Sequence, residues 1–192
     1  MRYQPMLLTK TAELPQGEDW VYEAKLDGYR MIGEVVLGQT RLTTRKGNDF
    51  TDRYPQVADQ LPVAFGGQDV VCDGELVGFN ESGQEDFAEL RRKHPRVIYF
   101  IFDLLEIDSR PLINVPLRER RHALEEVFSP QGSIHLSHVF SDREGIVAAA
   151  KQLDLEGVVA KRLSSVYRPG KRSKDWLKLI LKDHPERGRW DR

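Results

Sequence analysis

The arrangement best suited to covalent chemistry is a lysine, Lys25, that stands between an alternating run and an Asp-Gly turn at Asp27 and Gly28. Because residues before Lys25 alternate as a β-strand does, the amine should lie at a rigid strand end and face whatever the following loop encloses. A lysine amine attacks phosphorus or carbonyl carbon only when deprotonated, which requires desolvation or neighbouring cations. An exposed strand end gives the same short pattern, so the rest of the chain must decide between these interpretations.

Positive charge is concentrated in two stretches, although the chain of 192 residues has a net charge of −1. Residues 161–178 carry seven Lys or Arg against one acid, and residues 91–96 form a second basic cluster. Such clusters are either solvated faces or phosphate-binding surfaces with salt-dependent affinity. The length predicts a single domain over residues 1–192, large enough to bury its own core.

The sequence has no apolar run of about 18 residues, which a membrane-spanning helix would need. Residues 1–8 also lack the apolar segment of a signal peptide. The single cysteine, Cys72, lies in an apolar run and is expected to be a reduced core residue. These features predict an intracellular protein that does not bind membranes.

Strand and helix patterns indicate an α+β fold. Alternating stretches at 20–25, 31–37 and 41–44, joined by short turns, predict a meander of antiparallel strands. Residues 97–105 are apolar on both faces and predict a central, buried strand. Further strands are expected as a pair within 69–79 and singly at 156–162 and 176–181.

Helices are expected between these strands. The patterns place them after a cap at Thr51 or Asp52, over 84–93, from Pro116, and from a capping box at Ser141. Together the elements predict two packed, mainly antiparallel sheets flanked by helices.

Seven short motifs follow one another along the chain: Lys25-Leu26-Asp27-Gly28-Tyr29-Arg30, Thr44-Arg45-Lys46-Gly47, Asp73-Gly74-Glu75-Leu76, Phe102-Asp103-Leu104-Leu105, Glu156-Gly157-Val158-Val159-Ala160-Lys161, Tyr167-Arg168-Pro169-Gly170-Lys171-Arg172-Ser173 and Trp176-Leu177-Lys178. In this order and spacing they resemble the nucleotidyltransferase (adenylation) domain of ATP-dependent DNA ligases, which has an ATP-grasp-like fold. Within that family the resemblance is to bacterial ligases of double-strand-break end joining. Each motif alone is weak, but the ordered set covers nearly the whole chain.

The resemblance implies that Lys25 attacks the α-phosphorus of ATP, releases pyrophosphate and carries AMP as a lysyl phosphoramidate. Lys161 and Lys178 would be catalytic with it, because they would stabilise charge on the α-phosphate. The implied nucleotide contacts are Glu23 to the adenine amino group, Glu75 to the ribose hydroxyls, Phe102 stacked on the base, and Arg30, Arg45, Lys161 and Lys178 near ribose or phosphate.

The same resemblance implies a metal and a nucleic acid. Glu156 and Glu75 would hold Mg²⁺ or Mn²⁺, since hard carboxylate oxygens suit these cations. The partner would be nicked double-stranded DNA, in a bacterial-type protein that is cytoplasmic and associated with the nucleoid. The implied DNA-binding residues are Arg30, Arg45, Lys46, Arg168, Lys171 and Arg172.

Two departures from the family pattern stand out. Ile180 occupies the position where the last motif usually has a second lysine, and Lys182 could compensate only if the strand bulges or ends early. Too few residues follow the last motif for the oligonucleotide-binding (OB-fold) barrel of these ligases. The chain is therefore expected either to be one domain of a longer enzyme or to work with a separate barrel domain or end-joining repair proteins as partners.

Two other functions remain open at this point. RNA ligation or capping-type guanylyl transfer uses the same lysine chemistry. A DNA nick- or end-binding module with weak or lost adenylation would fit the substitution at Ile180. The motif spacing favours a DNA ligase over both.

Overall fold

Strand β6 (Val97–Ile107) lies in the middle of the larger sheet, as its apolar sequence predicts. The structure is a computed structural model that describes residues 1–181. Within them, β6 pairs with β5 (Val70–Gly78), β7 (Arg110–Pro111) and β8 (Ile134–Leu136). β3 (Gly28–Val36) joins β5 to β4 (Gln39–Thr44), and every pairing in this sheet except β6–β8 is antiparallel.

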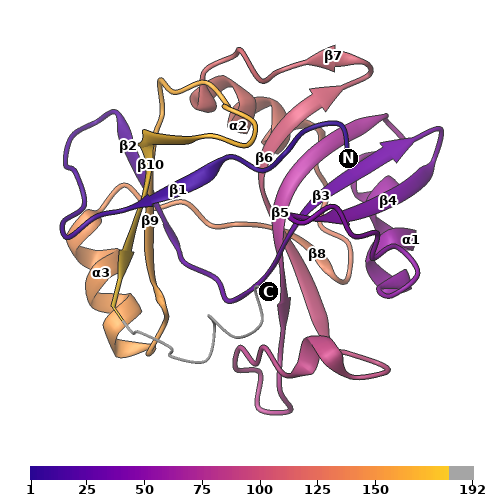
Figure 1. Cartoon of the computed structure of the whole chain (residues 1–192), viewed down its shortest axis with the longest axis horizontal. Coiled ribbons are helices and arrows are strands. Elements are labelled where there is room, and N and C mark those ends of the chain that lie inside the picture. The colour runs from indigo at the N-terminus through magenta and orange to yellow at the C-terminus, as the bar shows by residue number, and fades with distance from the viewer. Residues whose placement is uncertain (182–192) are drawn as a thin grey trace.

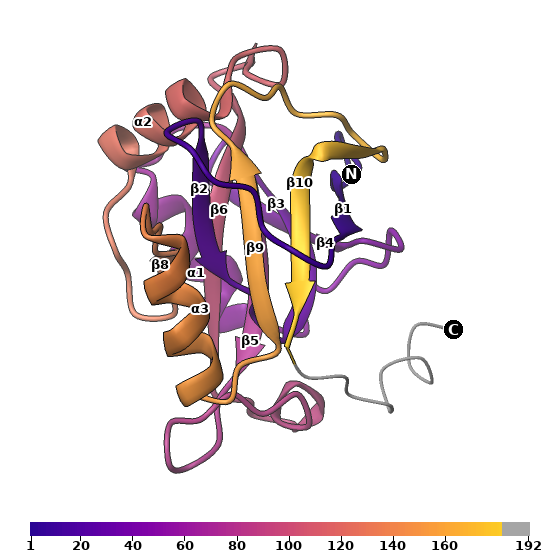
Figure 2. The same ribbon diagram turned by 90° about the vertical axis from the view of Figure 1, so that its left-hand side faces the viewer.

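The smaller sheet places its strands in the order β1 (Leu7–Lys10), β10 (Arg172–Ile180), β9 (Gly157–Arg162) and β2 (Trp20–Ala24). β1 runs parallel to β10, and the other pairs are antiparallel. Beyond β2, the backbones of Tyr22 and Phe140 exchange two hydrogen bonds of 2.9 and 2.8 Å. Figures 1 and 2 show this sheet facing the larger one.

Helices cover the outer faces of both sheets (Figures 1 and 2). α3 (Arg143–Gln152) packs on the smaller sheet, α1 (Pro55–Ala64) packs on the larger one, and α2 (Leu117–Val127) lies against β6. Apolar residues from both sheets meet between them, as α+β packing requires. The predicted fold class, two packed and mainly antiparallel sheets flanked by helices, is therefore confirmed. Among the described residues no helix is long and apolar enough to span a bilayer.

The predicted meander is wrong in one pairing. β3 and β4 form the expected hairpin, but β2 pairs with β9 in the other sheet. The chain therefore crosses between sheets at residues 25–27. Alternation along β2 predicts which side chains share a face, yet it carries no information about the partner strand.

Other local predictions also differ from the structure. β5 is one strand with irregular register rather than a strand pair. Residues 84–93 form only a 3₁₀ helix, Glu89–Arg91, and the backbone is already extended at Arg92. α1 begins after Tyr54 without a side-chain cap, and Asp142 rather than Ser141 caps α3.

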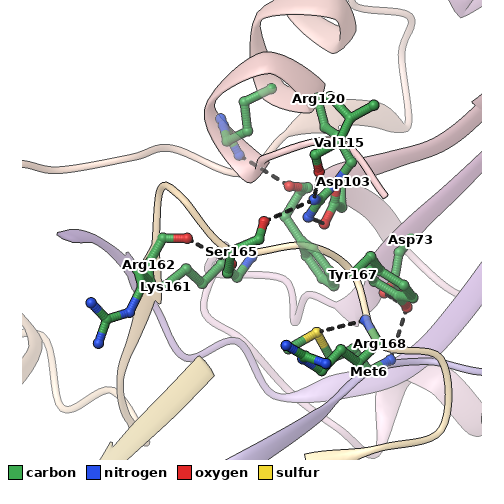
Figure 3. Close-up of polar contacts among 12 residues, drawn as sticks. Met6, Asp73, Asp103, Val115, Arg120, Lys161, Arg162, Ser165, Tyr167 and Arg168 are labelled. Atoms are coloured by element: carbon green, nitrogen blue, oxygen red, sulfur yellow. Dashed lines mark hydrogen bonds and ion pairs between the residues drawn. The ribbon is translucent and has the colours of Figure 1, made fainter. Parts of the chain in front are cut away.

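A buried ion pair fastens α2 to β6. Asp103 accepts two hydrogen bonds of 2.7 Å from Arg120, and both side chains are fully buried. Arg120 also donates to the backbone carbonyls of Val115 and Ser165, at 2.6 and 3.2 Å (Figure 3). The guanidinium thus ties the loop between β9 and β10 to the centre of the larger sheet.

Replacing Arg120 by Ala should cost about 3–5 kcal/mol of unfolding free energy, because it leaves the Asp103 charge buried and unpaired. Urea unfolding measures this cost. Arg118→Ala, at an exposed position on the same helix, should stay within about 0.5 kcal/mol of wild type. A loss for Arg120→Ala no larger than that of Arg118→Ala would show that the pair does not stabilise the fold.

Candidate active site

A pocket opens between the two sheets and gathers Lys25 with five of the seven predicted nucleotide contacts. Its charged and aromatic lining comes from strands of both sheets and from the crossing after β2. The lining residues are Leu8, Glu23, Ala24, Lys25, Leu26, Arg30, Glu75, Phe102, Ser137, Val159, Lys161 and Trp176.

Lys25 lies where the chain leaves the smaller sheet. Its backbone N–H donates to the Gly157 carbonyl at 2.9 Å, which anchors the position against β9. Its ammonium donates to Glu156 Oε2 at 2.6 Å, and the two side chains are 17% and 9% exposed. The amine is therefore oriented by a carboxylate at the strand end, as the sequence predicts. Glu156, expected to bind a metal, contacts this lysine directly.

Deeper on the same strand face, Glu23 forms a buried ion pair with Lys161. The Nζ–Oε1 distance is 2.8 Å. Ser137 donates to the other carboxylate oxygen at 3.1 Å, and Arg121 lies 3.6 Å from Oε1. Burial lowers the pKa of Lys161, an effect that the Glu23 charge opposes. Sequence reasoning missed Arg121 and Ser137, because neither lies in a motif.

Phe102 presents its ring to two cations. The Lys161 ammonium lies 3.9 Å and the Arg30 guanidinium 4.5 Å from the ring centroid. Each distance fits a cation–π contact. Since Phe102 is 6% exposed and belongs to the core between the sheets, a base can stack only on its pocket side.

Arg30 is held by a network that the sequence did not reveal. Asp73 accepts hydrogen bonds of 2.6 and 2.7 Å from Arg30 and one of 2.5 Å from the Tyr167 hydroxyl. The Met6 N–H donates to Tyr167 at 2.9 Å, and the Met6 carbonyl accepts from Arg30 at 3.3 Å. Figure 3 shows Tyr167 and Asp73 pointing toward each other, with Met6 and Arg168 beside them. The segment before β1 thus supplies part of the site.

Glu75 stands opposite Arg30 in the β3–β5 pairing and lines the pocket. Burial raises the pKa of Glu75 to about 7, while the charges of Arg30 and Lys25 oppose the shift. This carboxyl group therefore changes protonation near neutral pH.

Lys178 and Ile180 share the strand face that carries Trp176, as predicted, while Leu177, Leu179 and Leu181 pack toward α3. Burial lowers the pKa of Lys178, and the nearby Lys25 lowers it further. Ile180 pairs with Gly157, whose carbonyl holds the Lys25 backbone. Lys182 lies outside the described residues.

The other predicted DNA-binding residues are exposed. Arg45 and Lys46 follow β4, where the Arg45 N–H donates to the Arg30 carbonyl at 3.1 Å. Arg168 and Lys171 lie in the loop between β9 and β10, and Arg172 begins β10 and donates to the Leu8 carbonyl. Arg30 differs from them, because it is turned into the pocket.

Comparison with curated proteins finds end-joining ligases. The chain is 38% identical over 183 residues to the multifunctional non-homologous end joining protein LigD of Pseudomonas aeruginosa, covering 91% of this chain and 21% of that protein. It is 32% identical over 200 residues to the SPbeta prophage-derived DNA ligase-like protein LigB of Bacillus subtilis, covering 97% and 70%. The chain thus spans about a fifth of the length of the LigD relative.

Solved structures agree in fold. A mycobacterial DNA ligase D complexed with ATP and MES superposes with a TM-score of 0.83 at 33% identity, covering 94% of this chain and 61% of that one. The ligase domain of Mycobacterium tuberculosis LigD gives 0.80 at 34% identity, covering 92% and 58%. The family model described as ATP dependent DNA ligase domain matches residues 5–179. The chain therefore belongs to the ATP-dependent DNA ligase domain family.

Proposed function

We propose that this chain adenylates itself on Lys25 with ATP and passes the AMP to the 5′-phosphate of nicked double-stranded DNA. The observation that carries the proposal is the Lys25 amine, which is held by Glu156 and lines a pocket together with the Phe102 ring, two carboxylates and Lys161. Nicked DNA is the acceptor that the family suggests, and a separate barrel domain or end-joining proteins would assist.

In the first step the Lys25 nitrogen attacks the α-phosphorus of ATP. A nitrogen–phosphorus bond forms as the bond to the bridging oxygen breaks, and pyrophosphate leaves. The ammonium first loses one proton to Glu156, which already accepts its hydrogen bond at 2.6 Å, and the second proton leaves with the pyrophosphate as the nitrogen–phosphorus bond forms. Lys178 and Lys161 stabilise charge on the transferring phosphoryl group.

In the second step an oxygen of the DNA 5′-phosphate attacks the α-phosphorus, and Lys25 leaves and regains its proton. The 3′-hydroxyl then attacks the 5′-phosphorus, which closes the strand and releases AMP. The exposed cations that would contact phosphates of the duplex are Arg45, Lys46, Arg168, Lys171 and Arg172.

The positions of Glu23 and Glu75 in the pocket indicate which part of the nucleotide each would contact. Glu23 lies two residues before Lys25 on the same strand face, about 6.8 Å deeper, so it suits the base. The Lys25 charge opposes the rise that burial causes in the pKa of Glu75, so the two groups are close enough to interact. Because Lys25 would attack the α-phosphate, Glu75 suits the ribose next to it.

Mg²⁺ or Mn²⁺ fits the two carboxylates near Lys25. Mg²⁺ is usually held by one or two carboxylates together with phosphate oxygens and water, and it acts as a Lewis acid on the phosphates. Glu156 and Glu75 are the residues that would hold it.

We expect Lys25→Ala to abolish AMP attachment, because it removes the nucleophile. Intact-mass measurement after incubation with ATP and Mg²⁺ should show one added AMP on the wild type, lost again when pyrophosphate is supplied. Lys151→Ala, on the exposed face of α3, should behave as wild type. An AMP adduct that survives in Lys25→Ala would refute the assignment.

Ile180→Lys should speed adduct formation about ten-fold, because it adds a cation beside the α-phosphate. The rate of AMP uptake at saturating ATP checks this. Leu153→Lys, an equal charge change at the exposed residue that follows α3, is the control. Equal rates for both variants would mean that Ile180 does not limit the reaction.

Glu75→Gln should become increasingly more stable than wild type as the pH rises from about 4.5 to about 7. The raised pKa means that between these pH values an unfolded Glu ionises while the folded wild-type Glu75 stays protonated, so ionisation stabilises only the unfolded chain. The difference should level off above pH 8 at about 1–3 kcal/mol, measured by urea unfolding. Glu81→Gln, at an exposed position, should give a flat difference; the same flat result for Glu75→Gln would contradict the raised pKa.

A further inference from the structure

We propose that Arg121 is a positioning residue that holds the Glu23 carboxylate while Lys161 serves the phosphate, and that it thereby makes the pocket select a base with an exocyclic amino group. This inference rests on the proposed function. It adds a specificity determinant on α2 that lies outside every sequence motif.

Glu23 needs a permanent cationic partner. Its side chain is buried, and an unpaired carboxylate in such a place costs several kcal/mol. Lys161 is the nearest cation at 2.8 Å, Ser137 donates to the other oxygen at 3.1 Å, and Arg121 lies at 3.6 Å.

Lys161 cannot keep both of its present contacts when a nucleotide binds. Its ammonium lines the pocket 3.9 Å from the centroid of the Phe102 ring, so a base that stacks on the same face of the ring must displace it. Aromatic stacking places rings at centroid distances of about 4.5–7 Å, which leaves no room for an ammonium between them. Phosphate oxygens attract the displaced ammonium, and Glu23 then loses its closest cation.

The Arg121 guanidinium is held in place by contacts that do not involve Glu23 or the nucleotide. Its guanidinium donates to the backbone carbonyls of Phe102 and Ser137, at 3.3 and 3.2 Å, and approaches Glu125 at 3.5 Å. The residue is 7% exposed. These contacts tie the guanidinium to the segments that carry the stacking ring and the Ser137 hydroxyl, so the carboxylate keeps a fixed position relative to the ring.

A fixed, ionised carboxylate can only accept hydrogen bonds. A 6-amino group on the purine donates one, whereas a 6-oxo group brings a second acceptor and a bare C6–H leaves the carboxylate unpaired. Sites built to bond a polar group reject analogues that lack it far more strongly than apolar pockets reject a missing methyl group. By fixing the Glu23 carboxylate, Arg121 thus makes this acceptor selective for a base with a 6-amino group.

The test compares ATP with purine riboside triphosphate, which lacks the 6-amino group, and with GTP. AMP-type adduct formation gives kcat and KM for each nucleotide, and calorimetry gives their affinities. Arg121→Met should raise the KM for ATP about ten-fold with little change in kcat, and should shrink the ATP preference over purine riboside triphosphate about ten-fold. Arg121→Lys should restore part of the preference, and Arg118→Met should match wild type.

Thermal unfolding of each variant separates positioning from packing. If Arg121→Met loses stability but keeps the wild-type preference ratio, Arg121 is only a packing residue and the inference is wrong. Affinities give this ratio even where no adduct forms, so a wild type that binds ATP without reacting refutes the proposed function alone. A wild type that binds no ATP refutes both.

Discussion

The Leu76 carbonyl oxygen occupies the space beside Gly28 where any other residue would place a side chain, and a Cβ built there would stand 2.0 Å from it. Gly28 opens β3 directly after the chain leaves the smaller sheet, so this close approach lets β3 pair with β5 from its first residue. Lys25 lies on the crossing, with its backbone bonded to Gly157 in the smaller sheet. The nucleophile consequently bonds to Glu156 and Gly157 beside the smaller sheet, and its charge acts on Glu75 of the larger sheet.

Buried charge is used in two different ways. Arg120 and Asp103 satisfy each other and the nearby carbonyls completely, so their pair fastens elements together. Lys161 and Glu23 face the pocket, where a ligand that offers both an anion and a donor can compete for each of them. A ligand with only one of these groups would leave one buried charge without its partner, which is costly.

Sequence reasoning found the strand faces and the motif residues, because side-chain alternation and motif order are local properties. Lys25, Glu23, Phe102 and Lys161 lie together in the pocket as expected. It did not find Met6 or Arg121, whose roles depend on contacts between segments more than twenty residues apart. The partner of β2 was missed for the same reason, since a strand pattern does not specify its neighbour.

The short strand β1 also affects whether the smaller sheet can pair with a strand of another protein molecule. It pairs with β10, and the Phe140 backbone pairs with β2, so both of those strands have a neighbour on their outer side. An open strand edge offers unpaired backbone groups to another chain and invites aggregation. Four residues that end in Lys10 make a poor template for such pairing, because the strand is short and charged at its end. The N-terminal segment, in which Met6 bonds to Tyr167 and Arg30, therefore also protects the smaller sheet from intermolecular β-pairing through β1.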